Sequence, residues 1–225
     1  MGEAIGDALP SAVGVALSPV PIIAVVLMLV TERARVNGPA FVVGWLVGLA
    51  AVGVIVLAVA GPTDASEDSE PATWISTLQL VLGLLLLLIA LRSWRARPHE
   101  GDEAPLPTWM GAIDAFGPGK AFGGAAVLVA LNPKNLLLAI AGAAAIAQTG
   151  VSGGEQAIAY AVFAVVATVG VAAPVVIYFV MGDRAAHVLD ELKSWMAHNN
   201  AVIMTVLCLI IGVKLVGDAL GGLTD

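Results

Sequence analysis

The chain is poor in charge, in aromatic side chains and in cysteine. Of its 225 residues only 12% are charged and 5% are aromatic, and Cys208 is the single cysteine. One cysteine excludes an internal disulfide and a paired-cysteine metal or redox motif. The net charge of -7 argues against nucleic-acid binding, which needs clustered lysines and arginines. We therefore expect no metal, no cofactor and no nucleic-acid partner.

Apolar residues make up 59% of the chain, and the mean hydropathy is +0.95. A soluble domain of this size cannot cover so much apolar surface, so lipid is the expected solvent. The acidic start, MGEAIGDALPS, lacks the basic residues of a secretory signal peptide. We therefore expect the first apolar segment to be retained in a multi-pass protein of the cell (inner) membrane.

A helix needs about 20 apolar residues to cross a bilayer. The chain has six such runs joined by short linkers, which predicts an all-α membrane protein with six antiparallel transmembrane helices. The runs are 9–30, 39–60, 74–94, 119–147, 156–181 and 200–220. Trp74 and Trp94 flank the third run, where interfacial anchors are common.

Basic residues concentrate in alternate loops. Eight of the ten lysines and arginines lie in or beside three segments: loop 31–38, the segment around 98–118 and loop 182–199. The other two loops, 61–73 and 148–155, hold none. The positive-inside rule makes the basic loops cytoplasmic and predicts that both termini lie outside. Within 182–199, Val188, Leu189, Leu192, Trp195 and Met196 recur at helical spacing. They predict a short amphipathic helix on the inner membrane surface, either a packing connector or a regulatory element.

Two five-residue strings indicate an internal repeat. VALSP at 15–19 and VALNP at 129–133 lie midway along the first and fourth runs, and LVLGLLLLLIAL (80–91) aligns loosely with CLIIGVKLVGDAL (208–220), glycine over glycine. Three runs per half predict two inverted halves. We expect a first repeat at 1–97, a cytoplasmic linker at 98–118 and a second repeat at 119–225, with the substrate site at broken helices near the midplane.

Prolines predict where those helices break. A proline removes a backbone donor and leaves carbonyls unpaired, which lipid tolerates only inside protein or beside a cavity. We expect Pro19 and Pro21 to break the first span and Pro133 to break the fourth. Neighbouring polar side chains are expected to bond the freed groups: Ser18, Asn132 and Asn135. For Pro174 in the fifth span a static kink is the preferred interpretation.

Lys134 and Lys214 are the two basic residues that lie neither in nor beside the predicted cytoplasmic loops. An ionisable group in a membrane span costs a few kcal/mol, so it is a functional hypothesis by default. Lys134 lies about 15 residues, or ~22 Å, into its span, too deep to reach the surface easily. Lys214 is followed one turn later by Asp218, so the two can pair on one helix face. Lys134, Lys214 and Asp218 are candidate coupling groups, although a structural role for the Lys214 pair is equally compatible with the sequence.

The breaks SPVP and NPKN, in six spans with an inverted repeat, resemble the LysE transporter superfamily. Four longer stretches resemble its GAP family, the peptidoglycolipid (sulfolipid) addressing proteins of mycobacteria and their relatives: ALSPVPIIAVVLML, FxxGWLVGL, NPKNLLLA and NNAVIMTVLCLIIGVKLVGDALGGL. The resemblance implies an inner-membrane protein that helps to export glycolipids. It also implies a central path lined by Pro19, Pro21, Asn132, Pro133 and Lys134.

Two alternatives to glycolipid export follow from the same residues. An exporter of amino acids or other small solutes is one, although a cationic substrate would need buried carboxylates. A membrane adaptor for a lipid-synthesis complex is another. An enzyme is not expected, because His99, His187 and His198 lie in loops with no nucleophile or metal spacing around them.

No ATP-binding motif occurs in the sequence, so export would draw on an ion gradient or another protein. A homodimer is expected from the superfamily and from Gly44, Gly48 and Gly53, which permit close helix contact.

Overall fold

The computed structural model describes residues 1–60, 73–97, 113 and 116–224, and every regular element in that part of the chain is a helix. Most of loop 61–73 and of the predicted linker 98–118 lies outside the described residues. The α-helices are α1 (Gly2–Ala16), α2 (Pro19–Leu29), α3 (Ala34–Ala60), α4 (Thr73–Arg95), α5 (Pro118–Leu131), α6 (Pro133–Gln148), α7 (Gly153–Met181) and α8 (Ala185–Thr224).

The helices agree with the six predicted apolar runs. In the described residues, α3, α4, α7 and α8 are each long and apolar enough to cross a membrane. The remaining runs are bent pairs, α1 with α2 at 50° and α5 with α6 at 74°, and they bring the total to six if each pair is one span. The all-α, multi-pass class is confirmed. Helix α7 continues unbroken through Pro174.

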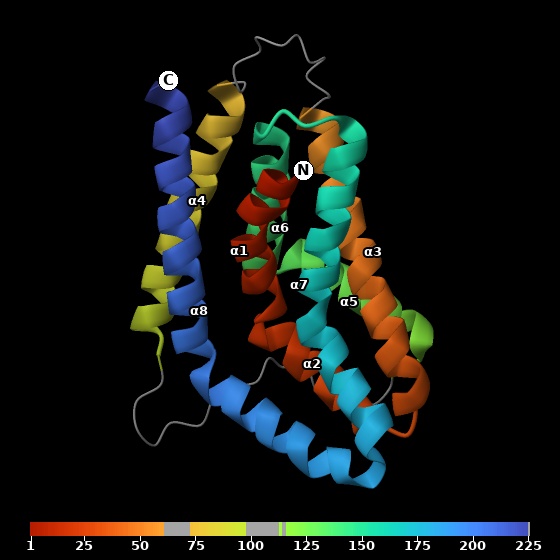
Figure 1. Cartoon of the computed structure of the whole chain (residues 1–225). Helices are drawn as coiled ribbons and strands as arrows, with labels where there is room; N and C mark the ends of the chain where they lie inside the picture. The colour runs from red at the N-terminus through yellow and green to blue at the C-terminus, as the bar shows by residue number, and fades with distance from the viewer. Residues whose placement is uncertain (61–72, 98–112, 114–115, 225) are drawn as a thin grey trace.

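The helices stand side by side with both termini at the same end of the bundle, as Figure 1 shows. Helix α4 packs along α8 in the most extensive helix pair. Gly83 and Gly212 make that approach close, because a Cβ on either glycine would lie 3.0 Å from the carbonyl oxygen of the other. Small residues of this kind let membrane helices pack backbone to backbone.

The amphipathic segment predicted at 182–199 is helical, but it is not a separate short helix. It forms the first part of α8, which crosses the end of the bundle opposite the termini and then turns along α4 (Figure 1). Leu189 and Met196 are buried, whereas Trp195 is 58% exposed. No glycine or proline occurs between 185 and 211 to end the helix, so it runs on into the last span.

The glycines from which a homodimer was predicted are used inside the chain. A Cβ on Gly44 would strike the backbone of Phe122, one on Gly48 would lie 3.0 Å from Ala126 Cα, and one on Gly53 would strike the Tyr160 ring. These contacts join α3 to α5 and to α7. The interpretation of the three glycines as an intermolecular face is therefore wrong, and the homodimer remains a prediction without residues assigned to it.

Candidate functional site

The two broken spans have the same local structure. Ser18 and Asn132 both have extended backbones, with φ/ψ of -68°/115° and -81°/106°. In each case the next residue is a proline in the first turn of the following helix. Proline suits this position because its missing N–H would have no intrahelical partner there. VALSP and VALNP thus fold alike, and both breaks lie in the middle part of the bundle (Figure 1).

The polar side chains beside the breaks do not bond the freed backbone groups as predicted. Neither Ser18 nor Asn132 caps its helix through its side chain. Ser18 Oγ and both amide atoms of Asn135 are buried and have no hydrogen-bond partner among the described residues. A cap side chain accepts from the second or third N–H of its helix, and at the first break Pro21 occupies the third position and removes that donor. Buried polar atoms without partners are rare and mark a place where a polar ligand or water can bind.

Lys134 is buried, with 2% of its surface exposed. Its ammonium donates a hydrogen bond to Met204 Sδ at 2.9 Å, and a thioether is only a weak acceptor. Cys208, one turn beyond Met204 on α8, is buried as well. Among the described residues no carboxylate forms an ion pair with this lysine. The described part of the chain therefore supplies this ammonium with no paired counter-charge.

Two helix N-termini add to the positive potential near the middle of the bundle. Helix α2 begins at Pro19 and α6 begins at Pro133, so each starts at a break instead of at a membrane surface. The first turn of a helix presents free N–H groups and the positive end of its dipole. Together with Lys134, these termini suit an anionic or strongly polar group.

The remaining predicted site residues face different surroundings. Pro19 and Pro21 are buried in α2. Asn132 lines a pocket between α2 and α5, whereas Pro133 is exposed and lines a separate pocket against α4, beside Leu85 and Arg92. The structure therefore does not bring all the predicted residues to one cavity, because consecutive residues at a helix start point in different directions.

Lys214 forms the i, i+4 ion pair with Asp218, at 2.7 Å between Nζ and Oδ2. Asp7 of α1 is a second partner at 3.8 Å, and all three side chains are roughly a third to a half exposed. Sequence reasoning missed Asp7 because it began the first span at residue 9. Lys214 lies ten residues beyond Met204 on α8, or about 15 Å along the axis, so this pair is separate from Lys134.

Comparison with known proteins now decides the family. The family model described as Sap, sulfolipid-1-addressing protein, matches residues 8–221, which include both breaks, Lys134 and Lys214. The chain belongs to this family. The match confirms the resemblance to the sulfolipid addressing proteins that the sequence motifs indicated. No curated protein and no solved structure is significantly similar to the chain.

Membership of the sulfolipid-1-addressing family gives the protein a lipid-related role in a membrane. The family is one of addressing proteins and not a known enzyme family. In the described residues, no group of three or more histidines, cysteines or acids is placed to hold a metal ion.

Proposed function

We propose that the protein exports a glycolipid or a similar lipid with an anionic head across the inner membrane toward the cell envelope. The observation that carries the proposal is Lys134, a buried lysine beside the break between α5 and α6, whose hydrogen-bond partner among the described residues is a thioether. A charge in such a position is costly unless a partner arrives. A sulfolipid, from which the family takes its name, would bring both a negative head and apolar tails.

For the transport mechanism we propose two inverted halves. Helices α1, α2, α3 and α4 of the first half correspond, in this order, to α5, α6, α7 and α8 of the second. Three features support this correspondence. The breaks at Ser18 and Asn132 share one backbone conformation. Gly83 and Gly212, which align in sequence, meet each other between α4 and α8. Gly44 packs α3 on α5, and Gly170 packs the equivalent α7 on the equivalent α1, against the Ala16 carbonyl.

Lys134 and the two helix N-termini favour an anionic substrate over a cationic one. A cationic amino acid would need a buried carboxylate, and the acids nearest the middle, Asp7 and Asp218, already pair with Lys214. A membrane adaptor would need only the outer faces of the helices, so a buried lysine at a break would serve no purpose in it. The Lys214 pair remains a candidate for coupling export to an ion gradient.

The orientation is tested by cysteine labelling from either side of the membrane. In a Cys208→Ala background we expect Gly154→Cys to react with a membrane-impermeant maleimide from outside. We expect His187→Cys to react only from the cytoplasmic side. The physical reason is the excess of lysine and arginine in the loops at the His187 end. Reaction of residue 154 from the cytoplasmic side alone would invert the topology.

Export itself is tested by lipid analysis of cells with and without the protein. The inner membrane and the outer envelope are extracted separately, and the polar lipids of each are compared. We expect at least one acidic glycolipid to shift from the outer to the inner fraction when the protein is absent, with its total amount preserved. Loss of the lipid from both fractions would instead indicate a role in synthesis, as for an adaptor.

A further inference from the structure

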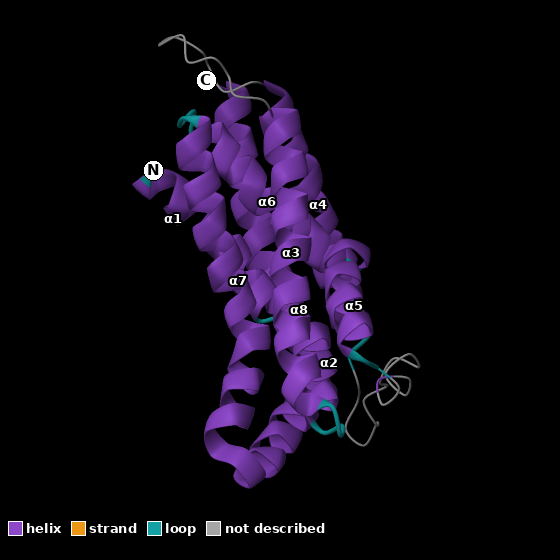
Figure 2. Cartoon of the chain, turned by 90° about the vertical axis from the view of Figure 1, so that its right-hand side faces the viewer, coloured by secondary structure: helices purple, strands orange, loops and turns teal. Residues whose placement is uncertain are grey.

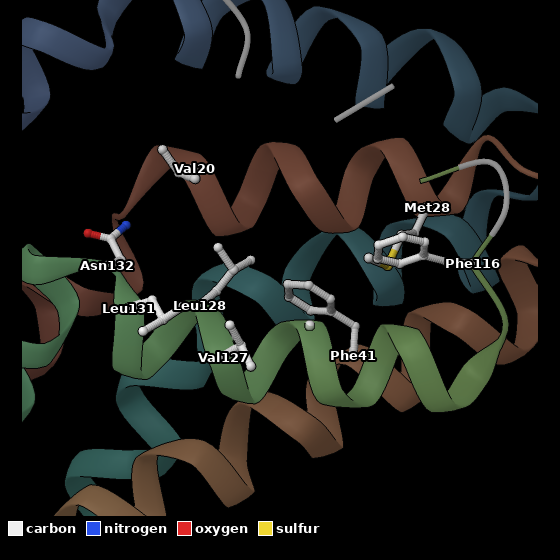
Figure 3. A pocket seen from close by; sticks show the side chains of 9 residues that line it. Val20, Met28, Phe41, Phe116, Val127, Leu128, Leu131 and Asn132 are labelled. Atoms are coloured by element: carbon white, nitrogen blue, oxygen red, sulfur yellow. The ribbon is translucent and has the colours of Figure 1, made fainter. Parts of the chain in front are cut away.

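An apolar pocket of about 410 Å³ lies between α2 and α5, which is within the usual range for ligand pockets of roughly 300–1,000 Å³. Figure 3 shows Val20 and Asn132 at one end and Met28 and Phe116 at the other. The walls are apolar apart from Asn132, and include Phe41 of α3 and Leu128 of α5. Along α2 the pocket extends from Val20 to Met28, a separation of eight residue steps or ~12 Å, close to the depth of one hydrocarbon leaflet.

The equivalent interface in the other half is closed. Under the inverted repeat, α2 and α5 correspond to α6 and α1. Helices α1 and α6 pack extensively, and a Cβ on Gly14 would lie 3.0 Å from Leu138. Helices α2 and α5, in contrast, share at most a marginal backbone contact. Several other equivalent helix pairs are packed in both halves, such as α3 with α5 and α7 with α1, or α4 with α6 and α8 with α2. The gap between α2 and α5 is therefore a departure from the symmetry that these pairs follow.

We propose that this pocket holds one alkyl chain of the lipid substrate, with its polar end beside Asn132. The inference rests on the proposed function and names the tail site for the same molecule. Water does not fill an apolar cavity favourably, so an alkyl chain is the matching occupant. Val127 and Leu131, 51% and 75% exposed, border the pocket and give it an opening toward the bilayer. Asn132, which lines the pocket, precedes Lys134 by two residues at the break, so the proposed tail site lies next to the proposed head site along the chain.

In the proposed orientation, the alkyl chain of the lipid enters the pocket laterally from the cytoplasmic leaflet. The pocket lies between the breaks and the ends of α2 and α5 that adjoin the basic loops, as the side view in Figure 2 shows for these two helices. A lipid could then place its head at the breaks while its tail remained in an apolar environment throughout. This avoids exposing the tail to water, which would cost about 25 cal/mol per Å² of apolar surface.

Photolabelling in vesicles tests the site without requiring transport. The full chain is reconstituted in vesicles of phosphatidylethanolamine and phosphatidylglycerol with a trace of phosphatidylglycerol carrying a diazirine near the end of one acyl chain. Adducts are mapped by mass spectrometry. We expect adducts on Val20, Phe41 and Leu128, which bulk lipid reaches poorly because Phe41 is fully buried and the other two are partly buried. Val165 and Val169, exposed on α7, report labelling by bulk lipid.

Gly124→Leu should block the pocket, and Gly123→Leu is its matched control. Gly124 lines the pocket, and a Cβ there would lie 3.6 Å from the Phe116 ring, so the rest of a leucine would fill the cavity. Gly123 has nothing within 4 Å. We expect Gly124→Leu to lower pocket labelling, relative to the α7 reference, about tenfold, and Gly123→Leu to leave it unchanged.

Either of two results would overturn the proposal. One is wild-type protein in which Val20, Phe41 and Leu128 carry no adducts while the α7 reference is labelled. The other is equal labelling of the two leucine variants, both folded by gel filtration. Val20→Trp, which narrows the pocket from the α2 side, replaces Gly124→Leu if that variant does not fold. Because labelling needs no export, a negative labelling result overturns the tail site without changing the outcome of the envelope lipid analysis. A negative lipid analysis would likewise overturn the export function without changing the labelling result.

Discussion

Lys134→Met should abolish most export while leaving the protein folded. The methionine keeps the length of the side chain and removes the charge, so a polar lipid head loses its charged donor at the break. A hydrogen bond to a charged group contributes about 1.5–3 kcal/mol, which corresponds to a fall of roughly 10- to 100-fold in export rate. Stability should be unchanged or higher, because Lys134 is buried with Met204 as its weak partner and no carboxylate is left behind.

Movement of labelled lipid from the outer to the inner leaflet of inverted membrane vesicles measures the first effect, and thermal unfolding in detergent measures the second. Lys134→Arg should restore little, because a planar guanidinium does not replace a compact ammonium in a confined site. Lys214→Met is the matched change at the other intramembrane lysine. Its effect should be smaller, since Lys214 is 31% exposed and lies far along α8. If Lys134→Met exports at the wild-type rate, Lys134 is a structural lysine and the site must lie elsewhere.

Gly170→Ala should destabilise the protein strongly, although it adds only one methyl group. The new Cβ would overlap the carbonyl oxygen of Ala16, a backbone atom at the end of α1 that cannot turn away as a side chain could. Overpacking of this kind costs about 1–3 kcal/mol or more, even though alanine favours a helix over glycine by about 0.5–1 kcal/mol. Because Ala16 ends α1 just before the first break, the change should also displace that break.

Gly154→Ala is the control, since it is on the same helix and a Cβ there meets nothing within 4 Å. It should leave the melting temperature in detergent equal or slightly higher, whereas Gly170→Ala should lower it by several degrees or prevent folding. The two substitutions are chemically identical, so a lower melting temperature for Gly170→Ala alone would be caused by the contact between α7 and α1. Equal melting temperatures would mean that these helices do not approach so closely.

Local properties of the chain were enough to predict much of the architecture. Transfer from water to lipid depends on the apolar character of each run, so the four long apolar helices and the two bent helix pairs follow from hydropathy. Proline acts on its own turn, so the breaks before Pro19 and Pro133 were predictable from their positions. The membership of the sulfolipid-1-addressing family was likewise visible in motifs that are contiguous in the sequence.

Partners contributed by other helices could not be predicted in this way. The second acid beside Lys214, Asp7, lies at the opposite end of the chain, and Met204 is 70 residues from the lysine that it contacts. Gly44, Gly48 and Gly53 permit close packing, but the sequence does not say whether the partner is another copy or the same chain. Ser18 and Asn135 could have bonded the freed backbone, and their lack of partners depends on where their side chains point.

By itself, then, the sequence determined which segments enter the membrane, where two of them break and that a lysine lies beside one break. Each of these depends on the free energy of a short segment in lipid. Only the tertiary structure decided that α1 closes on α6 while α2 stands apart from α5, and that Asn132 and Pro133 face different pockets. It also decided that none of the carboxylates it describes pairs with Lys134. Those outcomes depend on how helices distant in the sequence pack against one another, because contacts between them exist only in the assembled bundle.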